Sequence, residues 1–463
     1  MNAIDGDGFS TLSKVLIANR GEIAARIIKT CRRLGIRTVA IYSDADKDAV
    51  HTRLADEAYR VGESPPLRSY LSIPNICDAV SKSGADGVHP GYGFLSEVHE
   101  FGAAVEKTGA VWIGPKPETM RLVGSKTYTR RVARENGIPT IPGAYRPVSN
   151  AGELEPMLQE HGTLLIKPDE GGGGKGTRKV SDLPSAAEGL EAASREAKLY
   201  FGNGAVYAEK LLDRPRHVEA QILADNYGNI VHLFERECSL QRRFQKVVEE
   251  APSLALTEDQ RRSLLETAVG MAKAIGYNNA GTFEFLFEES SGRFYMLEIN
   301  KRLQVEHPVT EMTTGMDIVE QQIRIASGEE LSVKQSDIVR RGHSIEARIY
   351  AEDPRNFTPS PGRVTKFSLK SLPHVRVDHA LESGTNVSFY YDPLIAKVVS
   401  WGENRAEAIS RMREALSEIV IEGIKTTLPL HRVIFGMKDF EDGRFDTTYL
   451  EERLPQIQSQ IKE

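Results

Sequence analysis

The chain has 463 residues, of which 40% are hydrophobic and 27% charged, as expected for a globular protein of roughly three domains. Its net charge of −6 does not indicate a nucleic-acid-binding or membrane-binding surface. Three cysteines without paired spacing argue against a disulfide framework or a zinc site, and no apolar run approaches the ~18 residues of a membrane-spanning helix. Because residues 1–10 also lack the basic and apolar regions of a signal peptide, we expect a cytoplasmic protein with a loose tail there.

Residues 14–120 alternate between expected strands and helices. Residues 14–18 and 38–42 each indicate a buried strand, and residues 22–34 between them carry apolar side chains at a helical period. This β-α-β order predicts a parallel sheet with right-handed crossovers. No Gly-x-Gly-x-x-Gly follows the first strand, so a dinucleotide site is not supported. Tyr92 lies at a later strand-to-loop junction, where ligands bind in such sheets, although a packed glycine loop without a ligand fits the same pattern.

A run of four glycines lies in a small unit that we expect at residues 144–212, after a helical connector. A predicted strand ends at Lys167, and Gly171–Gly174 follow closely. Glycines leave the backbone free to donate N–H groups to phosphates, but the Gly-Lys-Ser/Thr ending of a Walker loop is missing. A flexible linker is the alternative. Strands on both sides of the glycines favour a hairpin lid that closes over nucleotide, and the backbone of residues 206–212 is suited to pairing with an adenine edge.

Two predicted strands carry carboxylates. Residues 281–288 place three phenylalanines on one face and Glu284 on the other, and a hairpin loop follows them. This places Glu284 close to Glu298 of the next strand, where like charges repel unless a cation neutralises them. Two carboxylates and the carbonyl of Asn300 form an all-oxygen set that suits Mg²⁺. Two unrelated surface glutamates are the alternative interpretation.

The alternation of polar and apolar residues continues beyond this strand. If the extended geometry also continues, the polar residues of the stretch share one face: Glu298, Asn300, Arg302, Gln304 and Glu306. A basic cluster at residues 241–250 lies between expected strands and is placed to face the same pocket as Arg302. A solvated surface is the usual role of such a cluster.

Taken together, these stretches resemble the biotin carboxylases, the ATP-grasp subunits or domains of biotin-dependent carboxylases. The resemblance runs from about Lys14 to about Leu454. It rests on six stretches that follow one another in the order of the family: Ile17–Ala24, His89–Glu97, Gly171–Gly176, Gln241–Pro252, Arg302–Glu311 and Arg341–Arg348.

The resemblance implies an α/β and α+β fold in three parts. An N-terminal parallel α/β domain of the pre-ATP-grasp, Rossmann-like type is expected at residues 11–122. An ATP-grasp domain is expected at residues 123–335, with the glycine-loop lid at about 144–212. A C-terminal mixed α/β subdomain is expected at residues 336–458.

The resemblance also implies a role for each matching residue. Residues expected to bind ATP are Lys126, Lys167, Gly173, Gly174, Glu209, Lys210, Leu211, Leu212, His217 and Glu284. Residues expected to bind Mg²⁺ or Mn²⁺ are Glu284, Glu298 and Asn300, and those expected to hold bicarbonate are Lys246, Arg302 and the Val305 backbone. Glu306 is expected to deprotonate bicarbonate, whereas Arg348 and Tyr92 are expected to bind biotin, with Arg348 also stabilising its enolate. The expected catalytic set is therefore Lys246, Arg302, Glu306 and Arg348.

The implied reaction is an ATP-dependent ligation that carboxylates biotin through carboxyphosphate, the first half-reaction of a biotin-dependent carboxylase, with acetyl-CoA carboxylase as the first candidate. The sequence contains no Ala-Met-Lys-Met biotin acceptor in a small all-β domain. We therefore expect a biotin carboxyl carrier protein and a carboxyltransferase as separate chains, and the family implies a homodimer. Two alternatives remain: an ATP-grasp ligase for a different carboxylate, and a catalytically weak homologue that acts as a structural or regulatory subunit.

Three departures from the family pattern bear on the second alternative. Phe244 stands where the family usually has His, so a hydrogen-bond donor is missing near the nucleotide. Asp169 and Glu170 stand beside the phosphate loop, where they weaken ATP binding unless they point away or pair with a nearby cation. Lys301 replaces a small residue on the apolar face of its predicted strand, so we expect an acidic partner or an exposed ammonium group.

Overall fold

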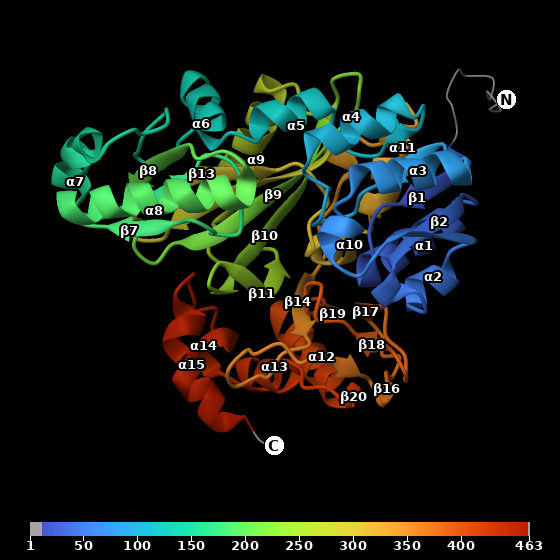
Figure 1. The fold of residues 1–463 in the computed structure, drawn as a ribbon. Helices are drawn as coiled ribbons and strands as arrows, with labels where there is room; N and C mark the ends of the chain where they lie inside the picture. The colour runs from blue at the N-terminus through green and yellow to red at the C-terminus, as the bar shows by residue number, and fades with distance from the viewer. Residues whose placement is uncertain (1–11, 462–463) are drawn as a thin grey trace.

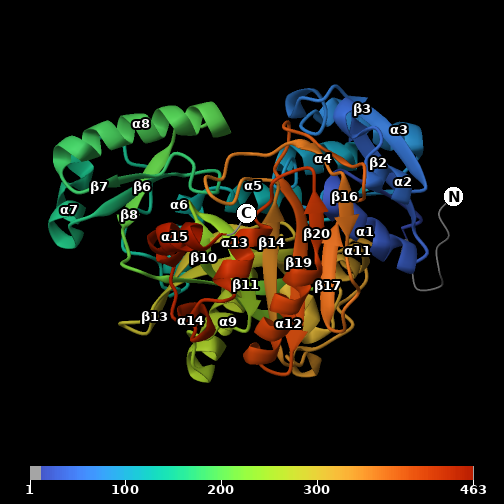
Figure 2. The same cartoon turned by 90° about the horizontal axis from the view of Figure 1, so that it is seen from below.

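The computed structural model describes residues 12–461, so the tail expected at residues 1–10 lies outside the described part. In Figure 1 the N-terminal region (blue) and a small unit (green) lie on opposite sides of a large central sheet, and the C-terminal region (red) lies below both. The view from below in Figure 2 shows the same separation of the blue and green parts.

The N-terminal part contains the expected parallel sheet. Its order is β3-β2-β1-β4-β5, and every neighbouring pair is parallel. The strands are β1 (Lys14–Ile17), β2 (Arg37–Ser43), β3 (Glu57–Gly62), β4 (Gly87–His89) and β5 (Val111–Trp112). The helices are α1 (Gly21–Arg33), α2 (Val50–Leu54), α3 (Ile73–Ser83) and α4 (His99–Lys107). The apolar period of residues 22–34 becomes the buried face of α1, which confirms the β-α-β prediction.

The small unit is a three-stranded antiparallel sheet of order β7-β6-β8 that is covered by one long helix. The elements between the N-terminal part and the end of this unit are α5 (Pro117–Val123), α6 (Lys126–Glu135), α7 (Glu155–His161), β6 (Leu164–Pro168), β7 (Arg178–Val180), α8 (Leu183–Phe201) and β8 (Val206–Lys210). Strands β6 and β7 pair on either side of the four glycines, so the predicted glycine hairpin is present. We call residues 171–176 the glycine loop.

The central sheet has eight strands in the order β13-β12-β9-β10-β11-β14-β19-β17, all paired antiparallel. They are β9 (Arg216–Ala224), β10 (Ile230–Arg242), β11 (Gln245–Ala251), β12 (Asn279–Glu288), β13 (Arg293–Asn300), β14 (His343–Tyr350), β17 (Val375–His379) and β19 (Leu394–Gly402). The helices α9 (Glu258–Ala274), α10 (His307–Thr314) and α11 (Ile318–Ala326) interrupt them in the chain. The three phenylalanines of β12 pack into one core with apolar residues of α9, which leaves Glu284 on the opposite face.

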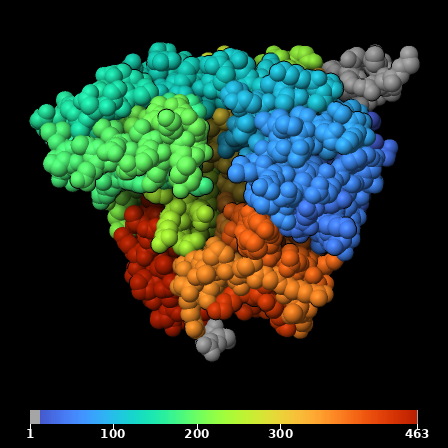
Figure 3. Space-filling view, in the orientation of Figure 1, coloured from blue at the N-terminus to red at the C-terminus, as the bar shows by residue number. Residues whose placement is uncertain are grey.

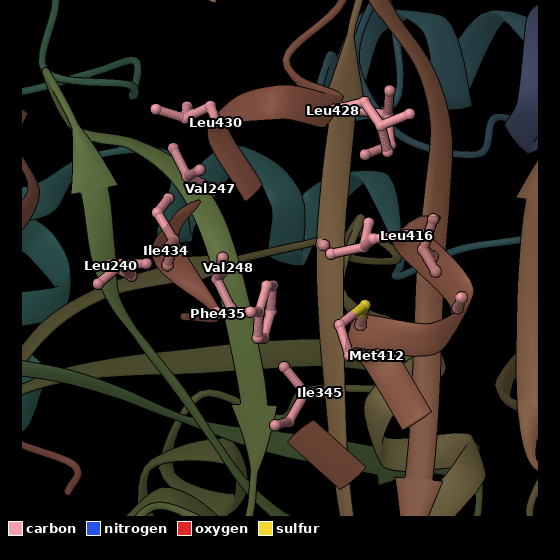
Figure 4. Close-up of a cluster of buried hydrophobic side chains, with 14 of the residues drawn as sticks. Leu240, Val247, Val248, Ile345, Met412, Leu416, Leu428, Leu430, Ile434 and Phe435 are labelled. Atoms are coloured by element: carbon pink, nitrogen blue, oxygen red, sulfur yellow. The ribbon is translucent and has the colours of Figure 1, made fainter. Parts of the chain in front are cut away.

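The C-terminal region completes this sheet and covers one of its faces. Its remaining elements are β15 (Gly362–Arg363), β16 (Lys366–Ser368), β18 (Asn386–Val387), β20 (Val420–Glu422), α12 (Arg405–Glu418), α13 (Leu428–Ile434), α14 (Lys438–Glu441) and α15 (Tyr449–Gln460). Figure 4 shows Val248 and Ile345 of the sheet facing Met412, Leu416 and Phe435 of the helices. Because side chains alternate along β14, packing Ile345 against these helices turns Arg348 toward the other face.

One strand prediction was wrong. Strand β13 ends at Asn300, and residues 301–306 form a turn that leads into α10. Pro308 lies in the first turn of that helix, where its fixed φ angle suits a helix start, so the chain leaves the sheet before it. Arg302, Gln304 and Glu306 therefore enter the site from a loop and not by strand alternation.

The sequence pattern also predicts strands over residues 363–384 and 387–400, and the structure divides both stretches into shorter strands. Gly384 adopts φ +101°, a conformation that strands of L-residues do not use, and it separates β17 from β18. In the part of the chain that the structure describes, no helix combines the length and the apolar character needed to cross a bilayer.

Candidate active site

Two buried carboxylates face each other on the hairpin of β12 and β13. The sequence predicted that Glu284 and Glu298 lie close together, and the strand register makes them direct partners. Asn300 ends β13 and donates from Nδ2 to Oε1 of Glu284 at 2.7 Å. Burial and the neighbouring Glu284 charge raise the pKa of Glu298. Two carboxylates in this arrangement favour a bound cation.

Lys246 lies at the centre of three carboxylates. Its Nζ lies 2.5 Å from Glu219 Oε2, 2.9 Å from Glu284 Oε1 and 2.5 Å from Glu306 Oε1. Burial acts to lower the pKa of Lys246, but the surrounding negative charges outweigh it and raise that pKa well above its usual value. Lys246 is therefore a fixed cation next to Glu306, and its strand, β11, contains part of the predicted basic cluster.

Glu306 is held between two cations at the start of α10. Its other oxygen, Oε2, lies 2.9 Å from Nη2 of Arg348, which also forms an ion pair with Glu249. Burial acts to raise the pKa of Glu306, but Lys246 and Arg348 hold it well below the usual range. The carboxylate is thus ionised at neutral pH, and its orientation is set by both partners.

Arg302 is held by hydrogen bonds to its own loop and to Glu97 of the N-terminal part. It donates from Nε to Glu97 Oε2 at 3.1 Å and from Nη1 to Gln304 Oε1 at 2.6 Å. The carbonyl of Val305 accepts a hydrogen bond from Lys397 Nζ at 2.8 Å. The Lys397 ammonium also lies 5.6 Å from the centre of the Tyr92 ring, whose buried hydroxyl has no hydrogen-bond partner among the described residues. Such a hydroxyl is suited to contact a ligand.

The two lysines predicted to hold phosphates lie on the side of the small unit. Lys167 Nζ is 2.9 Å from Glu209 Oε1, and Lys126 Nζ donates to the carbonyl of Gly171 in the glycine loop. Burial lowers the pKa of Lys126, whereas for Lys167 the Glu209 charge outweighs burial and raises the pKa. Both ammonium groups act to lower the pKa of Glu298, although burial and the Glu284 charge outweigh them, so both lysines are close enough to act on the carboxylates of the β12–β13 hairpin.

The segment expected to meet adenine already uses part of its backbone. The N–H of Lys210 donates to the Pro142 carbonyl at 2.8 Å, and that of Leu211 donates to Thr163 at 3.1 Å. Any pairing with an adenine edge therefore falls to other backbone atoms of residues 209–212. In the glycine loop, a methyl group added to Gly173 would meet no atom within 4 Å, so its backbone faces open space.

His217 lies between the candidate metal ligands and the basic groups. Its Nε2 lies 2.8 Å from Glu284 Oε2, and its Nδ1 lies 2.6 Å from Nε2 of Gln241. The ligand atoms of His217, Glu219 and Glu284 lie within 4.8 Å of one another, close enough to share an ion.

The structure brings into this cluster residues that the sequence prediction did not name. Glu219 binds both Lys246 and Arg236, and the Arg236 Nε to Glu219 Oε1 distance is 2.5 Å with both side chains fully buried. Glu219 pairs with Glu284 in the register of β9 and β12. Because His217 and Glu219 are two residues apart on one strand, alternation from His217 would have identified Glu219.

The structure also shows the contacts made at two of the three departures from the family pattern, the Asp169–Glu170 pair and Lys301. Both carboxylate oxygens of Asp169 are already paired, since Oδ1 accepts from the Thr127 N–H at 2.7 Å and Oδ2 accepts from Ser125 Oγ at 2.8 Å. Asp169 thereby binds the start of α6, while Glu170 accepts from Asn203 Nδ2 at 3.0 Å.

The prediction for Lys301 was wrong. Its ammonium group is only partly exposed and donates to the backbone carbonyl of Met120 at 2.8 Å, and none of the carboxylates in the described residues forms an ion pair with it. Burial lowers its pKa, and the Glu97 charge is the largest effect that opposes this. Lys301 escapes the expected burial on an apolar face because residue 301 follows the end of β13.

Figure 3 shows a deep hollow between the small unit (green) and the N-terminal part (blue), with the C-terminal region (orange) closing it below. The site thus lies between a glycine hairpin on a small sheet and a row of carboxylates and cations on a large one. This arrangement defines the ATP-grasp class of ATP-dependent ligases.

Comparisons with known proteins identify the family within that class. Three family models match: "Biotin carboxylase, N-terminal domain" over residues 11–120, "Carbamoyl-phosphate synthase L chain, ATP binding domain" over 125–334, and "Biotin carboxylase C-terminal domain" over 346–452. The chain is 47% identical to Biotin carboxylase 1 of Bacillus subtilis, over 95% of this chain and 98% of that protein. It is 48% identical to the biotin carboxylase of Haemophilus influenzae, over 96% and 99% of the two chains.

A solved structure agrees with these relatives. The biotin carboxylase domain dimer of Hydrogenobacter thermophilus 2-oxoglutarate carboxylase, in complex with MgADP, ADP and bicarbonate, superimposes with a TM-score of 0.93. The two chains are 46% identical, over 97% of this chain and 99% of that one. The chain belongs to the biotin carboxylase family.

Proposed function

We propose that this chain uses ATP and bicarbonate to carboxylate biotin on a carrier protein. The observation that carries the proposal is Glu306, a buried carboxylate placed between Lys246 and Arg348 at 2.5 and 2.9 Å. One of these cations is suited to bicarbonate and the other to the biotin ureido oxygen. A single base held between two anion-binding groups fits a reaction in which both substrates pass through anionic forms.

In the first step Glu306 takes the proton of bicarbonate, and the resulting oxyanion attacks the γ-phosphorus of ATP. ADP leaves and carboxyphosphate forms. Lys246 and Arg302 hold the bicarbonate, while Lys126 and Lys167 neutralise the phosphates under the glycine loop. Because the pKa of Glu306 is held well below its usual range, its contribution rests on position more than on basicity.

In the second step carboxyphosphate releases CO₂ and phosphate, and the phosphate takes the proton from biotin N1′. The electrons of the broken N–H bond move onto the ureido oxygen, where Arg348 stabilises the negative charge until N1′ attacks CO₂. Arg348 already contacts carboxylate oxygens of Glu306 and Glu249, so its guanidinium is oriented toward an anionic oxygen.

The residues proposed to bind Mg²⁺ fit that ion. Glu284 and Glu298 offer carboxylate oxygens from neighbouring strands, and the raised pKa of Glu298 indicates a site that gains from added positive charge. Asn300 would add an amide oxygen after rotation of its side chain. When bound, the ion would neutralise the charge that develops on the phosphates.

We also propose the division at residues 11–122, 123–335 and 336–458, which the ranges of the three family models support. The biotin carboxyl carrier protein and the carboxyltransferase are proposed as separate chains, and a homodimer is supported by the dimer of the Hydrogenobacter relative. Acetyl-CoA remains our first candidate for the final carboxyl acceptor. That relative belongs to a 2-oxoglutarate carboxylase, so 2-oxoglutarate is a second candidate acceptor to assay.

The deciding experiment measures ADP release from MgATP with and without bicarbonate and free biotin. Bicarbonate-dependent release that biotin accelerates is the expected result. Release that ignores both substrates would indicate a ligase for a different carboxylate. MgATP binding without any release, even with biotinylated carrier present, would indicate a structural or regulatory subunit.

A further inference from the structure

The glycine loop of the small unit is packed between two phenylalanine rings. A methyl group added to Gly171 would lie 2.3 Å from Cε1 of Phe201, and one added to Gly174 would lie 2.3 Å from Cδ2 of Phe244. Both glycines also have positive φ angles. Each ring therefore lies directly against the loop backbone, at a distance that only glycine permits.

The two rings differ in what they connect. Phe201 ends α8 and belongs to the same small unit as the loop, so it travels with the loop in any movement of the unit. Phe244 belongs to the turn between β10 and β11 of the central sheet. Of these two contacts, only the one between Phe244 and Gly174 joins the small unit to the central sheet, so only this one would change if the unit moved relative to that sheet.

The turn that carries Phe244 is anchored on the other side of the site. The Arg243 N–H donates to Glu451 Oε1 of α15 at 2.9 Å, and the guanidinium of Arg242 lies 3.8 Å from the centre of the Phe357 ring. These contacts fix the turn to the C-terminal region. The Phe244 ring thus contacts the glycine loop from a turn that is bound to the C-terminal region. Phe244 is nevertheless 60% exposed.

The backbone of this turn is strained in a way that glycine would relieve. Arg243 and Phe244 have φ angles of +48° and +65°, and Arg242 pairs with Gln245 across them. Two-residue turns with positive φ at both central positions strongly favour Asn-Gly, because a Cβ in this conformation crowds the following carbonyl. An exposed aromatic residue at such a position points to a role outside the turn itself.

We propose that Phe244 is a positioning residue that holds the lid closed over the nucleotide phosphates by packing its ring on Gly174. The closure rests on apolar contact between this ring and the glycine backbone. This inference rests on the proposed function, because it takes the glycine loop to be the lid over ATP.

The first test compares Phe244→Gly with Arg243→Gly. Both variants relieve left-handed strain at a central position of the same turn, and glycine at 243 keeps the N–H that binds Glu451. We expect Phe244→Gly to weaken MgADP binding about three- to tenfold and to raise the KM for ATP by a similar factor, with little change in kcat. Arg243→Gly should bind MgADP within about twofold of the unchanged protein.

If the Phe244 ring had a purely structural role in the turn, the order of the two variants would be reversed. Phe244→Gly should then be at least as active as the parent protein. Unchanged MgADP binding by Phe244→Gly would overturn the inference. If the parent protein itself binds no MgADP, the proposed function fails instead, so the two failures are distinguishable by calorimetry alone.

A second test measures the contact in the nucleotide-free protein. Backbone amides of residues 171–176 should exchange with deuterium faster in Phe244→Gly than in Arg243→Gly, because only the former releases the loop. Equal exchange in both variants would contradict the proposal. In a double-mutant cycle, Phe244→Ala should partly restore MgADP binding to Gly174→Ala, since the added methyl group then meets no ring. Strictly additive losses would contradict it as well.

The histidine variant gives a third readout. Phe244→His introduces a group that titrates near pH 6.5, so the KM for ATP should become pH-dependent between about pH 5.5 and 7.5, with tighter binding at the acidic end. The unchanged protein should show only the weaker dependence that comes from titration of the ATP phosphate itself. A parent protein with the same pH profile as the variant would show that the ring does not decide nucleotide binding.

Discussion

At the scale of single residues, the site depends on one carboxylate that two cations share. Glu306 lies 2.5 Å from Lys246 and 2.9 Å from Arg348, and all three groups are removed from bulk water. A glutamine in its place keeps the shape but cannot accept the bicarbonate proton and leaves both cations without this counter-charge. We expect Glu306→Gln to lower bicarbonate- and biotin-dependent ADP release by at least about 10²-fold.

MgADP binding separates this chemical effect from unfolding. Most of the residues proposed to hold ATP lie on α6, β6, β8 and the loops that follow β6 and β8, away from Glu306, so calorimetry should find nearly unchanged MgADP affinity in Glu306→Gln. Turnover within about tenfold of the parent protein would exclude Glu306 as the base. Loss of nucleotide binding together with turnover would show that the substitution acts through the fold.

At the scale of elements, an acidic residue beside the phosphate loop serves as a helix anchor. Asp169 ends the β6 segment and binds the start of α6 through the Thr127 N–H and Ser125 Oγ. Because Lys126 begins that helix, Asp169→Ala should cost about 1 kcal/mol of stability and weaken ATP binding. Glu170→Ala, which removes the adjacent carboxylate bonded to Asn203, should leave ATP binding nearly unchanged.

Calorimetry with MgADP and thermal unfolding of both variants check this expectation. From the sequence alone, charge repulsion predicts the opposite result, namely that removing Asp169 strengthens nucleotide binding. Tighter MgADP binding by Asp169→Ala would therefore favour the electrostatic interpretation over the anchoring one.

A second element-scale prediction concerns the junction of β11 with α12. Glu250 accepts from Arg405 Nε at 2.6 Å, and its Oε2 lies 2.6 Å from His343 Nε2. Burial acts to raise the pKa of Glu250, but Arg405 and His343 lower it to about 2 from an unperturbed 4.5. A depressed pKa means that the ionised group stabilises the fold above about pH 4.5 and that this contribution is lost as the pH falls toward about 2.

The pH-dependent part of this contribution is about 3 kcal/mol. Glu250→Gln should therefore have a lower free energy of unfolding than the parent protein. The difference between the two proteins should be largest at about pH 7 and smaller at about pH 3.5. Urea unfolding midpoints of both proteins at the two pH values measure this difference in stability. A difference that stays constant or widens in acid would contradict the assigned cause.

The elements also show what the sequence could and could not predict. The closeness of Glu284 to Glu298 followed from alternating phenylalanines and a short turn, because both signals are local, whereas their exact register came only from the structure. The same alternation failed past Asn300, where Pro308 and the start of α10 decide the path of the chain. The roles of Asp169 and Phe244 depend on contacts with segments far along the chain, such as Ser125 and the glycine loop, which no local pattern encodes.

At the scale of the whole molecule, one buried network of ion pairs joins the N-terminal part, the segment of α10 and α11, and the C-terminal region. Arg26 of α1 lies 2.9 Å from Glu311 of α10 and 2.8 Å from Asp317 at the start of α11. Arg376 of β17 reaches the same Glu311 at 2.6 Å. The helix that carries Glu311 begins directly after Glu306, so this network also fixes the start of α10 at the site.

Removing one buried cation should therefore destabilise the molecule and disturb the site together. Arg26→Met leaves Glu311 and Asp317 with less compensation, which should cost about 3–5 kcal/mol, and bicarbonate-dependent turnover should fall while MgADP still binds. Arg33→Met is the matched control, because Arg33 also lies 2.7 Å from Asp317 but its side chain is 52% exposed, so its loss should cost less than about 1 kcal/mol. Equal urea midpoints for the two variants would show that burial does not decide the strength of this network. Unchanged turnover in Arg26→Met would show that the network does not hold Glu306 in position.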